Sequence, residues 1–105
     1  MSDDVVFRAL ADPTRRALLD SLRAHDGQSV TSLCDVAPEM TRFGIMKHLK
    51  LLAAAELVIA RQDGRSTLHF LNPVPIQRIH RRWVAQYLAP FASSLVELEA
   101  RFDTA

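Results

Sequence analysis

The segment after Thr41 combines cationic and apolar side chains, and this combination can bind a phosphate-bearing polymer. The side chains are Arg42, Phe43, Met46, Lys47 and Lys50. Lysine and arginine bind phosphate groups, and apolar side chains can pack on thymine methyl groups. No acidic residue lies between positions 40 and 55. The segment therefore carries the residue types of a nucleic-acid contact.

A helix over residues 42–54 is predicted to position these side chains. With about 100° between successive residues, Ile45, Leu49 and Leu52 share one side, and the side chains at positions 43, 46, 47 and 50 lie opposite. Thr41 is the expected N-cap. These residues alone equally fit an ordinary amphipathic helix with a basic outer face, so the flanking segments decide between the two interpretations.

The preceding segment predicts a helix-turn-helix. Residues 29–37 are expected to form a short helix that begins near Ser29 or Thr31. Pro38 ends it, because proline disfavours the helical conformation of the residue before it. Two short helices joined by a tight turn form the motif that places its second helix in the DNA major groove.

Residues 57–71 predict a β-hairpin, or wing. Asp63-Gly64 separates two β-prone runs, which is the strongest short signal for a two-residue hairpin turn. Arg61, Arg65 and Ser66 lie near the predicted tip, where a wing would contact the phosphate backbone.

Three motifs in this order resemble the ArsR family of winged helix-turn-helix bacterial transcriptional regulators. They are FRALADPTRRALL at residues 7–19, HLKLL at residues 48–52 and DGR at residues 63–65. The resemblance covers nearly the whole chain. It implies a homodimeric repressor that binds a pseudo-palindromic operator in double-stranded DNA. Many members of the family are released from DNA by metal ions or redox signals.

The implied DNA contacts come from the predicted second helix and from the wing. They are Thr41, Arg42, Phe43, Met46, Lys47, Lys50, Arg61, Arg65 and Ser66. The lysines and the wing arginines are expected to supply most of the electrostatic affinity, whereas Phe43 and Met46 pack on thymine methyl groups. Arg42 can reach either a guanine or a phosphate. Gly44 and Met46 stand where many relatives carry hydroxyl residues, so the operator sequence cannot be inferred.

The distribution of charge supports this interpretation better than the net charge of +1 does. Residues 40–82 carry a net charge of +6, whereas residues 1–39 carry −3 and residues 83–105 carry −2. Such a local basic footprint is what phosphate binding requires. Chance clustering on a solvated face would also have to explain the arginines of the hairpin.

The expected fold is mainly α with a small β-hairpin, in one domain of 105 residues. Two further helices are predicted at residues 3–10 and 13–24, the second with Asp12 as N-cap, Pro13 at its first position and an end near Gly27. A single cysteine fits a reducing cytoplasm, and no apolar run is long enough for a membrane span. We therefore expect a cytoplasmic protein with no membrane association.

An apolar stripe over residues 75–102 predicts a long helix that pairs with a second copy of the chain. A small winged helix has no core deep enough to cover such a stripe, although a helix folded back on its own domain is the alternative. Pro90 is expected to kink this helix or to split it. The predicted dimer-interface residues are Val6, Leu10, Ile79, Trp83, Tyr87, Phe91, Leu95 and Leu98.

No metal site and no cofactor are expected. The family's thiolate sensors use a Cys-x-Cys pair, but here Ser32 precedes Cys34, and a soft-metal site needs two or three thiolates. The family's second site also lacks its ligands around His80, and pairing His80 with His69 does not restore it. His48 is expected to be a hydrogen-bonded structural residue on the core side of its helix.

An enzyme is not expected, because no nucleophile elbow, phosphate-binding loop or paired-carboxylate motif is present. A winged-helix module for protein–protein contact without specific DNA binding remains the alternative. Salt dependence separates the two, because phosphate contacts release counterions. The inducer, if one exists, is unknown.

Overall fold

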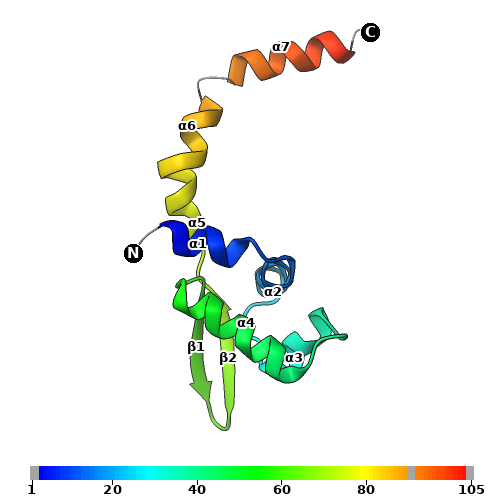
Figure 1. Ribbon diagram of the computed structural model, residues 1–105, viewed down its shortest axis with the longest axis vertical. Coiled ribbons are helices and arrows are strands. Elements are labelled where there is room, and N and C mark those ends of the chain that lie inside the picture. Colours follow the sequence, from blue (N-terminus) through cyan, green and yellow to red (C-terminus); the bar gives the residue numbers. More distant parts are fainter. Residues whose placement is uncertain (1–2, 90–91, 104–105) are drawn as a thin grey trace.

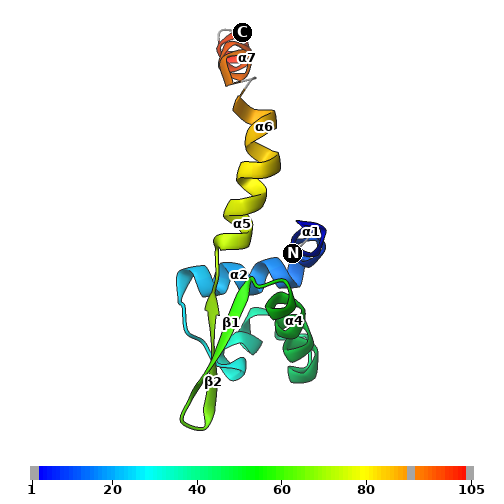
Figure 2. The same ribbon diagram turned by 90° about the vertical axis from the view of Figure 1, so that its left-hand side faces the viewer.

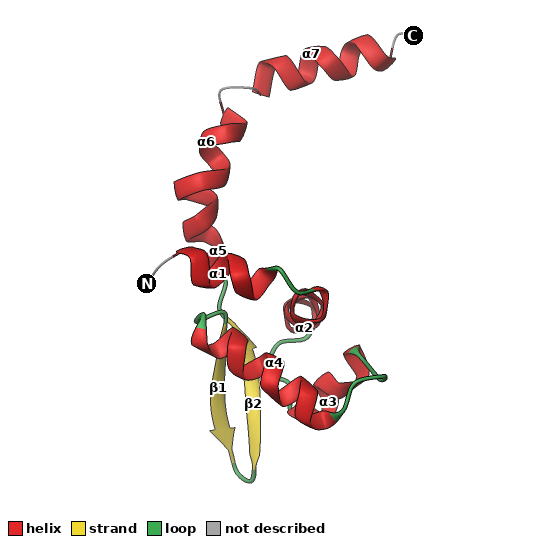
Figure 3. Cartoon of the chain, viewed as in Figure 1, coloured by secondary structure: helices red, strands yellow, loops and turns green. Residues whose placement is uncertain are grey.

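In the computed structural model, residues 3–89 and 92–103 are described, and they form seven α-helices and one β-hairpin (Figures 1 and 3). The elements are α1 Asp3–Leu10, α2 Pro13–Ala24, α3 Val30–Leu33, α4 Arg42–Ala54, β1 Val58–Asp63, β2 Ser66–Leu71, α5 Val74–Ile79, α6 Ala85–Leu88 and α7 Ala92–Asp103. This is the winged helix-turn-helix arrangement, with α4 as the second helix of the motif and the hairpin as the wing.

Side chains cap three of these helices at their N-termini. Asp12, Ser29 and Thr41 each accept a hydrogen bond from the backbone N–H three residues later, at 3.0 to 3.2 Å. Pro13 follows the first cap, where its missing N–H has no intrahelical partner to lose. The predicted starts of α2 and α4 are therefore confirmed.

Residues 29–37, which were predicted as one helix, contain two kinds of helix. The segment is α-helical only over Val30–Leu33 and continues as a 3₁₀ turn over Cys34–Val36. Ala37 leaves the helical region at φ −139° and ψ 78°, as expected for a residue before proline. The first helix of the motif is thus short and tightly wound at its end.

The core lies where α2, the 3₁₀ turn, α4 and the base of the hairpin meet. Its least exposed side chains are Leu18, Leu22, Leu33, Ile45, Leu52, Leu57 and Pro75. Leu18 and Leu22 come from α2, and Ile45 and Leu52 come from α4, so the predicted inward side of α4 is confirmed. Because this side is buried, the opposite face of α4 is exposed at the surface of the domain.

The hairpin is antiparallel, from Val58 opposite Leu71 to Asp63 opposite Ser66. The two loop residues are therefore Gly64 and Arg65, one position later than the Asp-Gly signal predicted. Gly64 has φ +61°, whereas the second loop residue does not have a positive φ. That pattern is typical of a type II′ hairpin loop, which takes glycine first. The shift places Arg65 at the tip itself.

The long helix predicted over residues 75–102 is interrupted. From α5 the chain passes through a π-helical turn at His80–Val84 into α6, which ends at Leu88. Figure 2 shows this stalk rising from the domain on the side opposite the wing tip, with α7 at its far end. Pro90 lies outside the described residues, between α6 and α7. Among the described residues, no helix combines the length and the apolarity needed to cross a membrane.

Two residues assigned to the dimer interface belong instead to the core. Val6 is 3% exposed and Ile79 is 6% exposed within the single chain, because α1 packs on α2 and α5. They have little surface left for a partner. Leu10 also packs against the core and is only partly exposed.

Candidate nucleic-acid interface

The outer face of α4 exposes two large apolar side chains beside two lysines. Phe43 is 77% exposed and Met46 is 49% exposed, and Lys47 and Lys50 beside them are exposed as well. These four residues line a shallow concavity of about 410 Å³. This exposed face follows from the helical periodicity, because the apolar stripe on the opposite side of α4 is buried.

A second groove runs between α4 and the hairpin. It has a volume of about 300 Å³, and Leu49, Ala53 and Ala60 contribute to its mostly apolar lining. His69 also lines it and is itself buried, with Nδ1 3.0 Å from the Gln28 carbonyl oxygen. The carbonyl can only accept, so Nδ1 donates. The contact joins the hairpin to the loop between α2 and α3, and it fixes the wing beside α4.

A third concavity is polar and lies between α3, the start of α4 and the wing tip. Its volume is about 320 Å³, and its lining residues are Ser29, Val30, Thr31, Arg42, Met46, Arg65, Ser66 and Thr67. Arg42 Nη1 donates to Thr31 Oγ1 at 2.8 Å. Thr31 and Thr67 carry no sequence signal for this site, because only the folded motif brings them beside residue 42.

Gly44 makes room for the side chain of Met40. A Cβ atom at this position would lie 2.8 Å from Met40 Cγ and 3.2 Å from its sulfur. Met40 packs against the core, so it is held over the first turn of α4. The glycine that departs from the usual family pattern is thus explained by the turn that precedes the helix.

A network centred on Arg15 supports α4 from its inner side. The guanidinium donates from Nε to the Ala9 carbonyl at 2.7 Å and from Nη2 to the Arg8 carbonyl at 3.1 Å. Its Nη1 lies 3.3 Å from His48 Nδ1 on α4. The end of α1, the start of α2 and the middle of α4 therefore meet at one side chain. The structural role expected for His48 is confirmed by this contact.

Asp12 completes the network. The backbone N–H of Arg15 donates to Asp12 Oδ2, and this hydrogen bond is the main reason why the pKa of the carboxyl group is lowered. Burial opposes this effect, and the electrostatic interactions with Arg15 and His48 lower the pKa further. His48 Nδ1 lies 3.9 Å from Asp12 Oδ2.

Comparison with known proteins agrees with this geometry. The helix-turn-helix domain family matches residues 10–60. The transcriptional repressor SdpR of Bacillus subtilis is 32% identical over 69% of this chain and 78% of its own. An ArsR-like transcriptional regulator from Rhodococcus sp. RHA1 has 29% identity and a TM-score of 0.73, over 97% of this chain and 91% of that one. The chain belongs to the ArsR family of helix-turn-helix transcriptional regulators.

A further solved structure in the same group is that of Mb0332 from Mycobacterium bovis, a homodimeric winged helix-turn-helix DNA-binding domain. It has 25% identity and a TM-score of 0.62, over 85% of this chain and 79% of that one. In the present ArsR-family chain, the stalk carries the aromatic side chains expected to mediate association.

Those aromatic side chains form a cluster with α1. Trp83 is 51% exposed and Tyr87 is 58% exposed, and their ring centroids lie 5.0 Å apart. Phe7 meets Trp83 edge to face at 5.6 Å. Arg82 Nη1 lies 3.6 Å from Asp3 Oδ1, which also ties the stalk to α1. Phe7 rather than Val6 is thus the α1 residue on this surface.

The other predicted interface residues lie farther along. Leu98 on α7 is exposed. Phe91 and the side chain of Leu95 lie outside the described residues.

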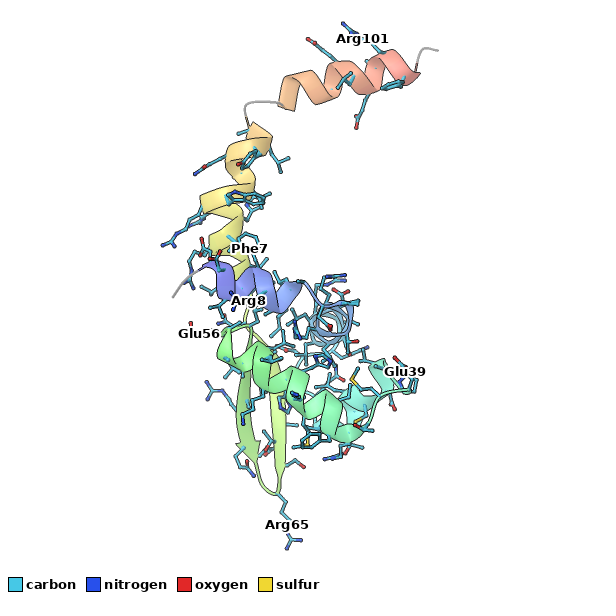
Figure 4. The ribbon with its side chains drawn as sticks, in the orientation of Figure 1. Phe7, Arg8, Glu39, Glu56, Arg65 and Arg101 are labelled. Carbon is cyan, nitrogen blue, oxygen red and sulfur yellow. The ribbon has the colours of Figure 1, made fainter. Side chains whose placement is uncertain are left out.

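The predicted DNA-contact residues outside α4 are exposed. Arg61 and Ser66 are exposed on the two wing strands, and Arg65 extends from the tip, well beyond the rest of the domain (Figure 4). Thr41 is exposed too, but its Oγ1 is occupied as the N-cap acceptor of α4. Within the described part of the chain, no group of three or more His, Cys, Asp and Glu side chains is arranged to hold a metal ion.

Proposed function

We propose that this ArsR-family chain is a homodimeric transcriptional repressor that places α4 in the major groove of a pseudo-palindromic operator. The observation that carries the proposal is the outer face of α4. It combines two lysines with two exposed apolar side chains, and no acidic residue lies in the helix. Lysines attract the phosphates, and apolar groups can distinguish bases that carry a methyl group.

The wing extends this surface along the DNA backbone. Arg61 lies on β1 and Arg65 lies at the tip, so the hairpin adds two exposed cations to those of α4. In proteins with this motif, the second helix enters the major groove while neighbouring elements contact the phosphates. The basic footprint of residues 40–82 is consistent with that arrangement.

Two relatives support the assembly and the direction of regulation. SdpR is a transcriptional repressor, and Mb0332 is homodimeric. A two-fold dimer presents two copies of α4 roughly 34 Å apart, one turn of DNA, to two half-sites. The aromatic cluster on the stalk is the surface that we assign to this association.

A mobility-shift titration on the DNA immediately upstream of the protein's own gene tests the proposal. We expect a dimer–DNA complex that forms more tightly on this DNA than on a scrambled duplex, and whose affinity falls steeply with salt. Affinity that does not change with salt would instead indicate an interaction module that binds other proteins.

A further inference from the structure

We propose that the polar hollow between α3, the start of α4 and the wing tip binds one phosphate group of the DNA backbone. Arg42 and Arg65 are its cations. The inference rests on the proposed function and deepens it, because it assigns Arg42 to the backbone rather than to a base.

The residues that line the hollow supply hydrogen-bond donors and positive charge. Two arginines and four hydroxyl groups lie around it, and no acidic side chain is among its lining residues in the described structure. A phosphodiester is a monoanion with two charged acceptor oxygens. Charge-assisted hydrogen bonds to such oxygens are about twice as strong as neutral ones. The chemistry of the lining therefore matches a phosphate.

Arg42 is oriented toward this hollow by a contact inside the motif. Its Nη1 donates to Thr31 Oγ1 at 2.8 Å, which holds the guanidinium against α3. The first helix of a helix-turn-helix crosses the DNA backbone, while the second lies in the groove. A side chain of α4 that is held against α3 is therefore directed at the backbone, and its planar fork can donate further N–H groups to a phosphate.

The opposite wall of the hollow is stabilised by the wing. The Gln62 side chain donates to the Gly64 carbonyl at 3.2 Å and accepts from Thr67 Oγ1 at 3.1 Å. These bonds brace the tip loop that carries Arg65, and the labelled side chain extends outward from it in Figure 4. Arg42 in one wall and the loop that carries Arg65 in the other are thus held by contacts within the protein before any anion binds.

Phosphate contact and base contact predict different results for Arg42→Ala. A phosphate contact positions the protein on any sequence, whereas a base contact specifies one sequence. We expect Arg42→Ala to weaken binding to operator and scrambled duplexes by the same factor, about ten- to a hundredfold. The slope of log affinity against log salt should fall by about one for each subunit. A loss confined to the operator would overturn the inference.

Thr31 is a positioning residue in this account, and its variants separate positioning from charge. Thr31→Val should weaken both duplexes about two- to tenfold with an unchanged salt slope, because Arg42 keeps its charge but loses its anchor. Thr31→Ser retains the hydroxyl group and should restore the affinity. If Thr31→Val binds like the wild type, the orientation of Arg42 does not depend on α3, and the inference fails.

The matched control is Arg81→Ala. Arg81 is an exposed arginine of the π-helical turn, on the stalk rather than near the wing tip (Figure 1). Its removal changes the net charge by the same amount, yet it should leave the salt slope unchanged. An equal fall in slope for Arg81→Ala and Arg42→Ala would show that net charge, not the hollow, accounts for the effect.

The source of the phosphate is tested with two probes on the wild type. A single methylphosphonate substitution at any contacted phosphate should lower the affinity of the wild type for the duplex. At one such position per half-site, the substitution should cost Arg42→Ala nothing further. Inorganic phosphate should not shift the backbone amide resonances of residues 31 and 66 below millimolar concentration. A saturable shift there would identify a free anion as the ligand and overturn the assignment. If the wild type binds no duplex at any salt concentration, the proposed function itself fails, and this inference fails with it.

Discussion

At the scale of single residues, Asp12 shows how much one side chain contributes to the recognition helix. It caps α2, and through Arg15 and His48 it adjoins the inner side of α4. The position was predictable, because an Asp-Pro pair before a helical stripe is a strong start signal. The link to α4 was not, because it depends on tertiary packing between residues 33 positions apart.

The lowered pKa of Asp12 makes a prediction about pH. The folded pKa lies below the unfolded value of about 3.9, so the carboxylate stabilises the fold above that pH, and the stabilisation is lost as the pH falls through the folded pKa. Asp12→Asn keeps a capping oxygen but not the charge. We expect it to lower the free energy of unfolding by about 0.5 kcal/mol at pH 7 and by nothing once wild-type Asp12 is protonated. Denaturant unfolding at stepped pH measures this. A difference that stays constant from pH 7 to pH 2.5 would contradict the account.

Cys34 is predicted to have a packing role only. It is partly buried against the core beside Leu33, and Ser32 occupies the position of a second thiolate. We expect equilibrium dialysis to find no stoichiometric zinc or cadmium site of sub-micromolar affinity. Cys34→Ser should leave DNA affinity unchanged and cost about 1 kcal/mol of stability. A tight metal site that Cys34→Ser abolishes would refute this view.

Some residue assignments failed for a common reason. Val6 and Ile79 were placed on the dimer face from helical periodicity, which identifies an apolar stripe but not what covers it. Here the domain's own core covers both. The sequence also did not decide whether Arg42 contacts a guanine or a phosphate, because periodicity does not show how a side chain is held. Only its contact with Thr31 gives it a direction.

At the scale of elements, the end of α4 depends on one unfavourable backbone conformation. Glu56 has φ +62°, and the N–H of Leu57 donates to the Leu52 carbonyl at 3.0 Å while that of Glu56 donates to Ala53 at 2.9 Å. This is the Schellman arrangement, in which the left-handed position usually holds glycine. The sequence carries no glycine there, so this helix end could be located only by the loss of the apolar pattern.

Glu56→Gly should therefore stabilise the domain. Glycine adopts a positive φ at no steric cost, and after its larger unfolded entropy is subtracted, we expect a gain of about 0.5–1 kcal/mol. The control Ala53→Gly, at an ordinary helical position of α4, should lose about 1 kcal/mol. Both are measured by urea unfolding. Destabilisation by Glu56→Gly would mean that the glutamate side chain has a structural role that the backbone argument misses.

Other features of the fold were likewise predicted where a short sequence pattern determines them and missed where no local pattern does. The caps of α2 and α4 and the existence of the hairpin follow from short patterns, and they were predicted. The π-helical turn at His80–Val84 and the one-residue shift of the wing loop have no comparable local signal. Both features affect functional side chains. The π-helical turn carries Trp83, which meets Phe7, and the shift of the wing loop puts Arg65 at the tip.

At the scale of the whole molecule, the chain is too extended for a self-contained domain. Its radius of gyration is 17.6 Å, whereas a compact domain of this length has roughly 13 Å. The excess comes from the stalk and α7, which leave the core on the side away from the wing (Figure 2). An exposed aromatic cluster on such a stalk is typical of an interface between subunits.

We expect a dimer in sedimentation at micromolar concentration, and Trp83→Asp should convert it to a monomer, because a charge would be buried in the interface. Circular dichroism should show that the helical content is retained, and DNA affinity should fall sharply. Gln86→Asp adds the same charge to α6 without removing an apolar side chain, and it should remain dimeric. A monomeric wild type at this concentration would refute the assembly.

In the proposed complex, the outer face of α4 contacts bases while the cations around it bind phosphates. The most direct test is a titration of the wild type, Phe43→Ala and Lys50→Ala on operator and scrambled duplexes at two salt concentrations. We expect Phe43→Ala to lose about 1–3 kcal/mol of binding free energy on the operator and much less on the scrambled duplex. Lys50→Ala should weaken both duplexes alike, with a reduced salt slope. Equal losses on both duplexes for Phe43→Ala would contradict the claim that α4 recognises the sequence.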